Sequence, residues 1–330
     1  MCRHILRRTA IAVLTVYLII TISFILVHVM PGDPVIHLVG QEEYYYLLDN
    51  DPVYLERQIE RYGLNESLPV QYIKYLKSIA TLDFGTAYAN QKPVTENVLK
   101  ASGWTLMLSV PTWLLGGLMG AVLGVLAGWK PGKRFDKIMT PFFLVINTIP
   151  ANCLSLIFLM FFSYRLKLFP INGMVSAGTE GIGRLFSILT HMCLPLFILI
   201  LFRTAGDFML MKSAVSQIRE EEYVLTARSK GIPGKHLLFI HVMKNAMVPY
   251  LTSFLMQMGS LLSGSMIVEV IFGWKGMGML MYNAVQNRDF PTAQLCFLIS
   301  AVCVVASSLL SDIVNAAIDP RIRTGDVYET

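Results

Sequence analysis

Long apolar stretches dominate the pattern of hydrophobic and polar positions. About 20 consecutive apolar residues are needed to cross a bilayer as an α-helix. Six stretches of the 330-residue chain meet this requirement. They are residues 9–30, 104–128, 138–162, 192–211, 249–268 and 293–314. The pattern therefore predicts an all-α polytopic membrane protein with six transmembrane helices.

The first stretch could instead be a secretory signal peptide. It is longer than the apolar region of such a signal, and it is followed by "MPGDP" rather than by a cleavage site made of small residues. We therefore expect a retained span, which places residues 1–30 in an N-terminal tip and first transmembrane helix.

Composition agrees with a membrane protein. Hydrophobic residues make up 54% of the chain and charged residues 15%, whereas a soluble domain has about 25% charged residues. The five cysteines are scattered, with no CxxC pair and no histidine cluster at zinc spacing. We expect neither a disulfide framework nor a metal site.

Lysine and arginine predict the orientation of the spans. The segments 1–8, 129–137, 212–248 and 315–330 together hold 15 of the 27 Lys and Arg residues. Cytoplasmic loops are enriched in these residues, so both termini and the loop 212–248 are predicted to be cytoplasmic. Residues 31–103 then form an extracytoplasmic segment, in which alternating apolar and charged residues between Asp51 and Leu82 predict two short amphipathic helices. They would lie on the outer face or at the lipid headgroups.

The second span carries a repeated glycine spacing. Its four glycines fall on one helical face and allow another helix to approach closely, so we assign them to helix packing. They are Gly116, Gly120, Gly124 and Gly128.

Polar residues and prolines mark a candidate translocation path. Pro141 and Pro150 should kink the third span, and Asn147 and Asn152 on it either line a path or are satisfied locally. Gln257 and Ser260 in the fifth span are further candidates for the path.

Two charges lie within the fourth span. Arg203 and Asp207 have the spacing of a helical ion pair. Because they lie near the cytoplasmic end predicted at Lys212, snorkelling to the headgroups favours a structural pair over a proton relay.

The loop between the fourth and fifth spans is rich in charge. "EEEYVLTARSK", from Glu220 to Lys230, predicts a short helix that Gly231 and Pro233 end. Pro249 is expected at the start of the following membrane helix. A solvated loop helix without a partner is the alternative that composition leaves open.

This loop resembles the cytoplasmic coupling motif of ABC importer permeases, in the variant of the dipeptide, oligopeptide and nickel branch. Further stretches are similar to the family in the same order, among them "HVMPGDPV", "INTIPANCLSL", "VEVIFGWKGMG" and "DIVNAAIDPRIR". Leu225 stands where the general motif has Glu, as this branch allows, and Lys275 stands where the family usually has Pro. The resemblance implies a type I ABC importer permease fold with a core over residues 104–330. It assigns ATPase coupling to Glu222, Tyr223, Thr226, Ala227, Arg228, Lys230 and Gly231.

The resemblance also implies partners. They are a second, homologous permease subunit in a heterodimer, two cytoplasmic ATPase subunits and an extracytoplasmic substrate-binding protein. The complex would lie in the plasma (inner) membrane of a prokaryote and import peptides, with nickel or a metal chelate as the alternative cargo. No nucleic-acid partner is expected.

We expect no catalytic residue in this chain. The phosphate-binding pattern GxxxxGK[ST] does not occur in the sequence, so ATP and Mg²⁺ would bind to the partner ATPases. A self-sufficient channel or an ion-coupled transporter would show internal repeats and central acidic residues, and we find no repeat. A membrane scaffold without transport would leave the coupling motif unexplained.

Overall fold

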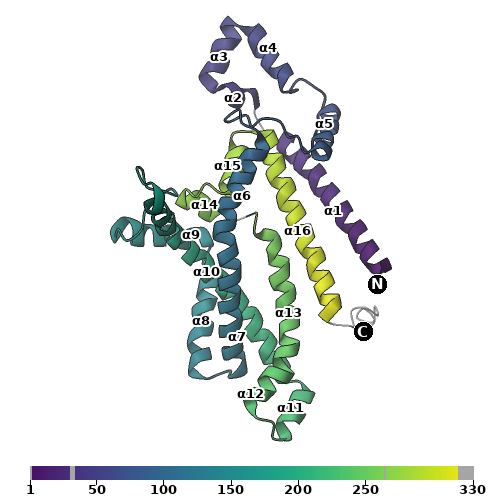
Figure 1. Cartoon of the computed structure of the whole chain (residues 1–330), viewed down its shortest axis with the longest axis vertical. Helices are drawn as coiled ribbons and strands as arrows, with labels where there is room; N and C mark the ends of the chain where they lie inside the picture. The colour runs from purple at the N-terminus through teal and green to yellow at the C-terminus, as the bar shows by residue number, and fades with distance from the viewer. Residues whose placement is uncertain (1, 30–33, 264, 319–330) are drawn as a thin grey trace.

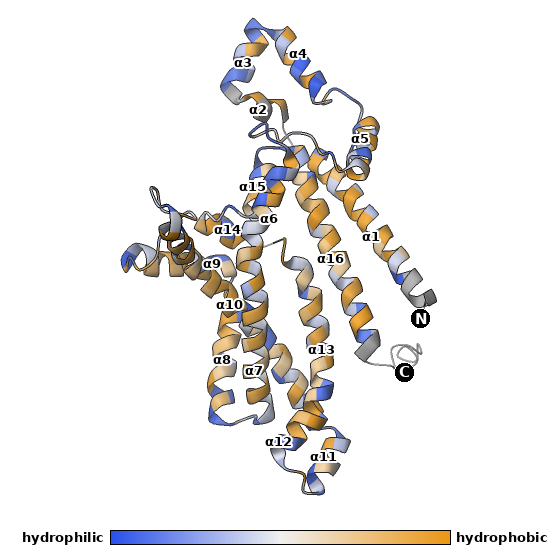
Figure 2. Ribbon diagram, in the orientation of Figure 1, coloured by the Kyte–Doolittle hydropathy of each residue, from blue (hydrophilic) through white to orange (hydrophobic). Residues whose placement is uncertain are grey.

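The computed structural model describes residues 2–29, 34–263 and 265–318. Within these ranges the elements are helices, joined by turns and one isolated bridge between Thr86 and Pro93. Helices α2–α5 lie at one end of the long axis, and α11 and α12 lie at the other (Figure 1). The apolar helices between these ends contrast with the more hydrophilic α3 and α4 (Figure 2). The arrangement is that of an all-α polytopic membrane protein.

Four continuous helical segments in the described ranges are long and apolar enough to cross a membrane. They are α1 (Cys2–Val29), the continuous run of α6 (Val94–Pro111), η1 (Thr112–Gly116) and α7 (Gly117–Trp129), α10 (Gly181–Arg219), and α16 (Phe290–Ile318). α1 packs along α16, and an ion pair between Arg8 and Asp312 joins them. η1 is a π-helical turn that follows Pro111, whose ring removes one backbone donor.

The third predicted span is broken rather than kinked. α8 (Arg134–Thr148) is followed by α9 (Ala151–Phe158) and η2 (Leu159–Arg165), and the two halves meet at an angle of 100°. Ile149 is extended, as is usual for a residue that precedes proline. Pro141, in contrast, lies inside α8. The bend at Pro150 is therefore the feature that sets the course of this segment.

The fifth predicted span is interrupted. One helical run extends from α12 (Gly234–His236) through η3 (Leu237–Val242), α13 (Met243–Met256) and η4 (Gln257–Ser260), and α14 (Met266–Phe272) follows a break. The expectation that Pro249 begins this helix is wrong, because Pro249 lies inside α13. Counting the bent pair as one, the described residues contain up to five candidate spans, so six are not confirmed.

α10 is much longer than the 20 residues predicted for the fourth span. Its 39 residues extend about 58 Å at 1.5 Å per residue, well beyond the roughly 30 Å of a hydrocarbon core. Pro195 is accommodated inside it. The extension carries the charged loop away from the apolar helices and ends next to α11 (Glu222–Ser229) (Figure 1).

The segment predicted to be extracytoplasmic contains four short helices among its described residues. The two that the sequence predicted are α4 (Pro52–Arg61) and α5 (Leu68–Thr81), and α2 (Pro34–Val39) and α3 (Gln41–Asn50) precede them. Buried Val35, Leu47 and Leu55 form a small core among α2, α3 and α4. Residues 94–103 belong to the long α6, so the segment between the first two spans is shorter than predicted.

The turn between α14 and α15 (Met277–Gln286) is tied to α6. Thr105 Oγ1 donates to Glu269 Oε1 at 2.7 Å, and the Met279 amide donates to Oε2 at 3.0 Å. Trp274 is fully buried and donates from Nε1 to the carbonyl oxygen of Trp104. These contacts fix the turn that carries Lys275.

Candidate functional site

The charged loop after α10 forms a short helix held at both ends. α11 starts after Glu221, whose amide donates to the Ile218 carbonyl at the end of α10. After Lys230 the chain turns at Gly231, whose φ of +77° lies in the left-handed region that favours glycine. The Gly231 amide donates to the Arg228 carbonyl at 3.0 Å. The predicted helix and its glycine stop are therefore both present.

One face of α11 packs on the chain itself. Val224 and Ala227 are buried in a hydrophobic cluster with Met211 and Val215 of α10 and Leu237 of η3. Ala227, which the resemblance assigns to ATPase coupling, thus contacts its own chain. Small size at position 227 allows α11 to lie close to its neighbours.

A hydrogen-bonded tyrosine joins α11 to the helix that follows it. Asn245 Nδ2 of α13 donates to Tyr223 Oη at 2.6 Å, and Tyr223 Oη donates to the His241 carbonyl oxygen at 3.4 Å. His241 lies in the π-helical turn η3. α11 is therefore connected to α10 by apolar packing and to α13 by polar contacts.

The opposite face of α11 is open. Six of the seven residues assigned to coupling are exposed, namely Glu222, Tyr223, Thr226, Arg228, Lys230 and Gly231. Leu225 on the same helix is 47% exposed, and Phe239 of η3 is 67% exposed. The sequence analysis did not include these two residues in the site. Their apolar side chains within a charged loop are the feature that could have indicated them. The surface therefore combines polar groups with exposed apolar side chains.

α10 connects this surface to the glycine face of η1 and α7. A Cβ at Gly120 would lie 2.5 Å from Asp207 Cβ, and one at Gly124 would lie 2.8 Å from Met211 Cβ. Gly116 and Gly128 similarly face Arg203 and Val215. All four glycines predicted to pack thus lie against α10, at distances too short for a larger residue.

Arg203 and Asp207 form an ion pair inside this seam. Arg203 Nε lies 2.6 Å from Asp207 Oδ2, and both side chains are largely buried. The guanidinium also lies over the ring of Phe254 of α13. The side chains are thus packed among α10, η1, α7 and α13, in the geometry of a helical ion pair.

The four residues proposed for a path form two pairs in the fold. Asn147 and Asn152 lie on either side of the bend at Pro150, and both are exposed. Gln257 and Ser260 lie in η4, where Ser260 Oγ donates to the Gln257 carbonyl oxygen at 2.8 Å. Among the described residues no hydrogen bond links the two pairs.

The part of the chain that the structure describes contains no group of three or more His, Cys, Asp or Glu side chains positioned to hold a metal ion. The open surface at this end of the molecule is formed by the exposed residues of α11 and by Phe239 of η3.

Known proteins resemble the chain over nearly its whole length. Residues 120–324 match the family of binding-protein-dependent transport system inner membrane components, and residues 1–109 match the N-terminal domain of such membrane components. The oligopeptide transport system permease protein AppB of Bacillus subtilis is 32% identical over 98% of this chain and 100% of its own length.

Two further relatives extend the comparison. The di/tripeptide transport system permease protein DppB of Pseudomonas aeruginosa is 29% identical over 98% of this chain and 99% of its own length. The glutathione transport system permease protein GsiC of Salmonella paratyphi A is 28% identical with the same coverage. The chain belongs to the family of binding-protein-dependent transport system inner membrane components.

Proposed function

We propose that this chain is one of two transmembrane subunits of an ATP-driven peptide importer, and that α11 docks on a cytoplasmic ATPase subunit. The observation that carries the proposal is the short helix at the end of α10, with one face packed on α10 and η3 and the other face open. Membership of the binding-protein-dependent transport family supports the same assignment.

Movement of the ATPase would reach the membrane helices through α11. Val224 and Ala227 would press on α10, and the Tyr223 hydroxyl would pull on α13. α10 packs tightly on α7 along the glycines. We therefore expect α7, α10 and α13 to move as one body. Rocking of two such bodies, one from each permease subunit, would alternate access to a path between them.

Membership of the transport family supports a proposal for the remaining parts of the complex. The N and C termini, α11 and the turn between α7 and α8 would face the cytoplasm, with ATP and Mg²⁺ held by the ATPase subunits. Helices α2–α5 and the turn at Lys275 would meet the substrate-binding protein on the other side of a bacterial inner membrane. The partner permease would be homologous but different.

Peptides are the proposed cargo because the relatives compared above are named for oligopeptides, di/tripeptides and glutathione. Asn147, Asn152, Gln257 and Ser260 remain the candidates for the path, with the exposed amides at the bend best placed to meet a partner subunit. Nickel uptake has only the family resemblance in its favour.

Uptake by the reconstituted complex tests the proposal. The chain is purified with its partner permease, ATPases and binding protein, and labelled dipeptide uptake and ATP hydrolysis are measured in proteoliposomes. Leu225→Asp with Arg228→Glu changes only exposed positions of α11, whereas Lys133→Glu changes an exposed charge in the α7–α8 turn. We expect the α11 variant to lose stimulated hydrolysis and uptake while the Lys133 variant keeps both. Uptake without ATPase subunits, or equal activity of both variants, would contradict the proposal.

A further inference from the structure

A cavity lies at the end of the bent span, where η2 passes into the loop before α10. Its volume is about 630 Å³, far more than the roughly 10–15 Å³ that one water molecule requires. Tyr164, Arg165, Lys167 and Ile171 are among the residues that line it. The cavity therefore has room for a polar group much larger than water.

The loop that forms the cavity is fixed to the rest of the fold. Phe162 and Phe169 pack in one apolar cluster with Phe272 of α14, and the Gly173 amide donates to the Phe272 carbonyl oxygen at 3.0 Å. α14 leads into the turn that Trp274 ties to the first part of α6, whereas α7 ends beside α11. Figure 1 accordingly shows α9 beside α14 and far from α11. The cavity therefore lies toward the side of the membrane helices opposite α11.

Two cationic side chains line this cavity without a counter-ion. Arg165 and Lys167 are both exposed, and no acidic residue is among those that line the cavity. Within the described part of the chain, neither side chain forms an ion pair. A guanidinium matches the oxygens of a phosphate or a carboxylate, and the neighbouring ammonium adds a second positive charge. The pair therefore favours an anionic ligand.

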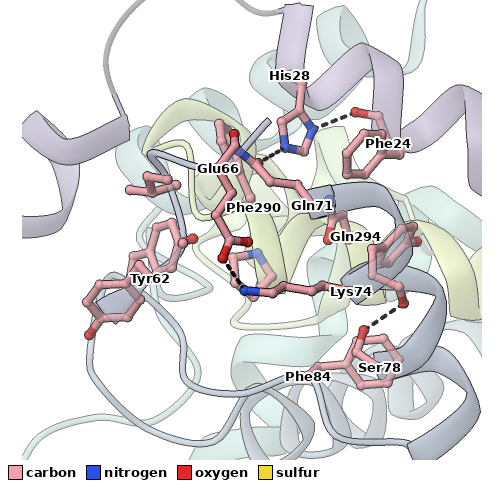
Figure 3. Close-up of a pocket in the computed structure, with 15 residues that line it drawn as sticks. Phe24, His28, Tyr62, Glu66, Gln71, Lys74, Ser78, Phe84, Phe290 and Gln294 are labelled. Atoms are coloured by element: carbon pink, nitrogen blue, oxygen red, sulfur yellow. Dashed lines mark hydrogen bonds and ion pairs between the residues drawn. The ribbon is translucent and has the colours of Figure 1, made fainter. Parts of the chain in front are cut away.

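Other lysines that line cavities already have counter-ions. In the cavity among α1, α5 and α16, the Lys74 ammonium lies 2.5 Å from Glu66 Oε1 (Figure 3). Lys100, which lines a cavity between α6 and α15, forms an ion pair with Glu96. Lys74 and Lys100 thus provide a comparison for the unpaired Arg165 and Lys167.

Exposed apolar side chains lead along α9 and η2 to the two cations. Phe158 and Phe162 pack inward on the cluster around α14, whereas Ile157, Met160 and Tyr164 are 57%, 62% and 69% exposed. Because this half of the span meets α8 at 100°, it runs across the direction of α8. A segment that crosses the membrane helices, with apolar side chains followed by cations, suits the boundary between acyl chains and headgroups.

We propose that the cavity holds the phosphate of a membrane phospholipid with a net negative charge. The phosphate lies between Arg165 and Lys167, and the acyl chains lie along the exposed side of α9 and η2. Basic pockets of this kind bind lipid phosphates. A zwitterionic lipid fits less well, because its own ammonium group would lie close to the same two cations. This inference goes beyond the proposed transport function and does not depend on the cargo.

Binding is tested with the full chain in nanodiscs of phosphatidylcholine that contain an increasing fraction of phosphatidylglycerol. Native mass spectrometry measures the fraction at which half of the protein retains one phosphatidylglycerol molecule. Phosphatidylcholine is the matched lipid, because it carries the same phosphate together with a quaternary ammonium group. We expect phosphatidylglycerol to be retained preferentially by the unchanged chain.

Variants separate the cavity from a general effect of charge. Arg165→Gln with Lys167→Asn removes both cations, and asparagine suits the left-handed backbone at position 167, where φ is +54°. Lys74→Gln with Lys100→Gln removes the same charge elsewhere. We expect the cavity variant to need about ten times more phosphatidylglycerol for half retention, since bonds to charged groups are the stronger ones. The Lys74 and Lys100 variant should bind like the unchanged chain.

A charge-preserving variant guards against misfolding. Arg165→Lys with Lys167→Arg keeps two cations in the cavity and should retain phosphatidylglycerol, whereas the neutral variant should lose it at an unchanged midpoint of thermal unfolding. Loss of binding in both variants would show that the charges are not what holds the lipid, which would overturn the proposal.

A photo-crosslink identifies what covers α9 and η2 in the assembled importer. A photoreactive amino acid replaces Met160 in cells that express the full complex, and the adducts are identified by mass spectrometry. A phospholipid adduct supports the proposal, whereas an adduct with the partner permease would show that protein covers this face and would overturn it.

Three further results would overturn the proposal. The first is equal retention of phosphatidylglycerol and phosphatidylcholine by the unchanged chain. The second is equal retention of phosphatidylglycerol by the neutral cavity variant and by the Lys74 and Lys100 variant. The third is release of phosphatidylglycerol by millimolar inorganic phosphate, which would assign the cavity to a free anion rather than to a lipid.

Discussion

Arg203 Nε of α10 lies 2.6 Å from Asp207 Oδ2, one turn further along the same helix, and the pair is enclosed by α7 and Phe254 of α13. Asp207 directly faces Gly120, and Arg203 faces Gly116. The charges are therefore held where α10 packs tightly against the glycine face of η1 and α7.

Breaking this pair should destabilise the protein strongly. Removing one partner of a buried ion pair leaves an uncompensated charge and costs about 3–5 kcal/mol. We expect Asp207→Ala and Arg203→Met each to lower the free energy of unfolding by roughly this amount. The double variant Arg203→Met with Asp207→Ala should lose less than the sum of the two, as measured by denaturant titration in detergent. Additive losses would argue against a coupled pair.

Gly120 is predicted to tolerate no side chain. A Cβ there would lie 2.5 Å from Asp207 Cβ and 2.9 Å from the Thr204 carbonyl oxygen. Gly120→Ala should cost about 1–3 kcal/mol through overpacking. Gly206→Ala is the matched control, because nothing lies within 4 Å of a Cβ at that position of α10. Thermal unfolding of both variants decides the matter, and equal midpoints would contradict the packing.

The link between α11 and α13 should be measurable as a coupling energy. Tyr223→Phe and Asn245→Ala both remove the 2.6 Å hydrogen bond between Asn245 Nδ2 and Tyr223 Oη. We expect a double-mutant cycle on unfolding free energy to give an interaction of about 0.5–1.5 kcal/mol. A coupling near zero would mean that the tyrosine does not join the helices in solution.

Asp289, which immediately precedes α16, is expected to make stability depend on pH. It accepts a hydrogen bond from the Thr292 amide, yet burial raises its pKa above the ordinary 3.8. The folded state then binds a proton more tightly than the unfolded state, so stability falls as pH rises from 3.8 through the raised pKa.

Replacing Asp289 tests the direction of this effect. Asp289→Asn keeps an acceptor for the Thr292 amide and removes the titration. The difference in unfolding midpoint, variant minus unchanged chain, should increase from mildly acidic to neutral buffer. Asp83→Asn, at an exposed aspartate, is the control. A difference that stays constant or decreases with pH would show that the carboxylate ionises without penalty.

The sequence predicts most of the helical framework, because apolar length and loop charge are properties of local composition. It also predicts the short helix ending at Gly231, since a left-handed stop leaves a clear signal in sequence. The sequence predicts a kink at Pro150 but not its angle of 100°. Proline removes one backbone hydrogen bond in any helix, and the packing of neighbouring helices then sets the angle.

Other features depend on contacts between distant residues. Gly259, beside the break after Ser260, packs closely against α16, where a Cβ would lie 2.6 Å from Val304 Cα. The burial of Ala227 follows the return of η3 to α10. Neither contact can be inferred from the residues on either side of it. For the same reason, the sequence indicates Asn147 and Gln257 as candidates for one translocation path, whereas the fold places them in separate elements, α8 and η4.

The most direct test of the account is a photo-crosslink from α11. A photoreactive amino acid replaces Leu225, whose side chain is 47% exposed, or Tyr46, which is 64% exposed in α3. Cells that express the full complex are irradiated, and the adducts are identified by mass spectrometry. The account predicts an adduct between position 225 and the ATPase subunit, and none between position 46 and that subunit. Absence of an ATPase adduct at 225, or equal adducts at both positions, would contradict the assignment of α11 as the docking helix.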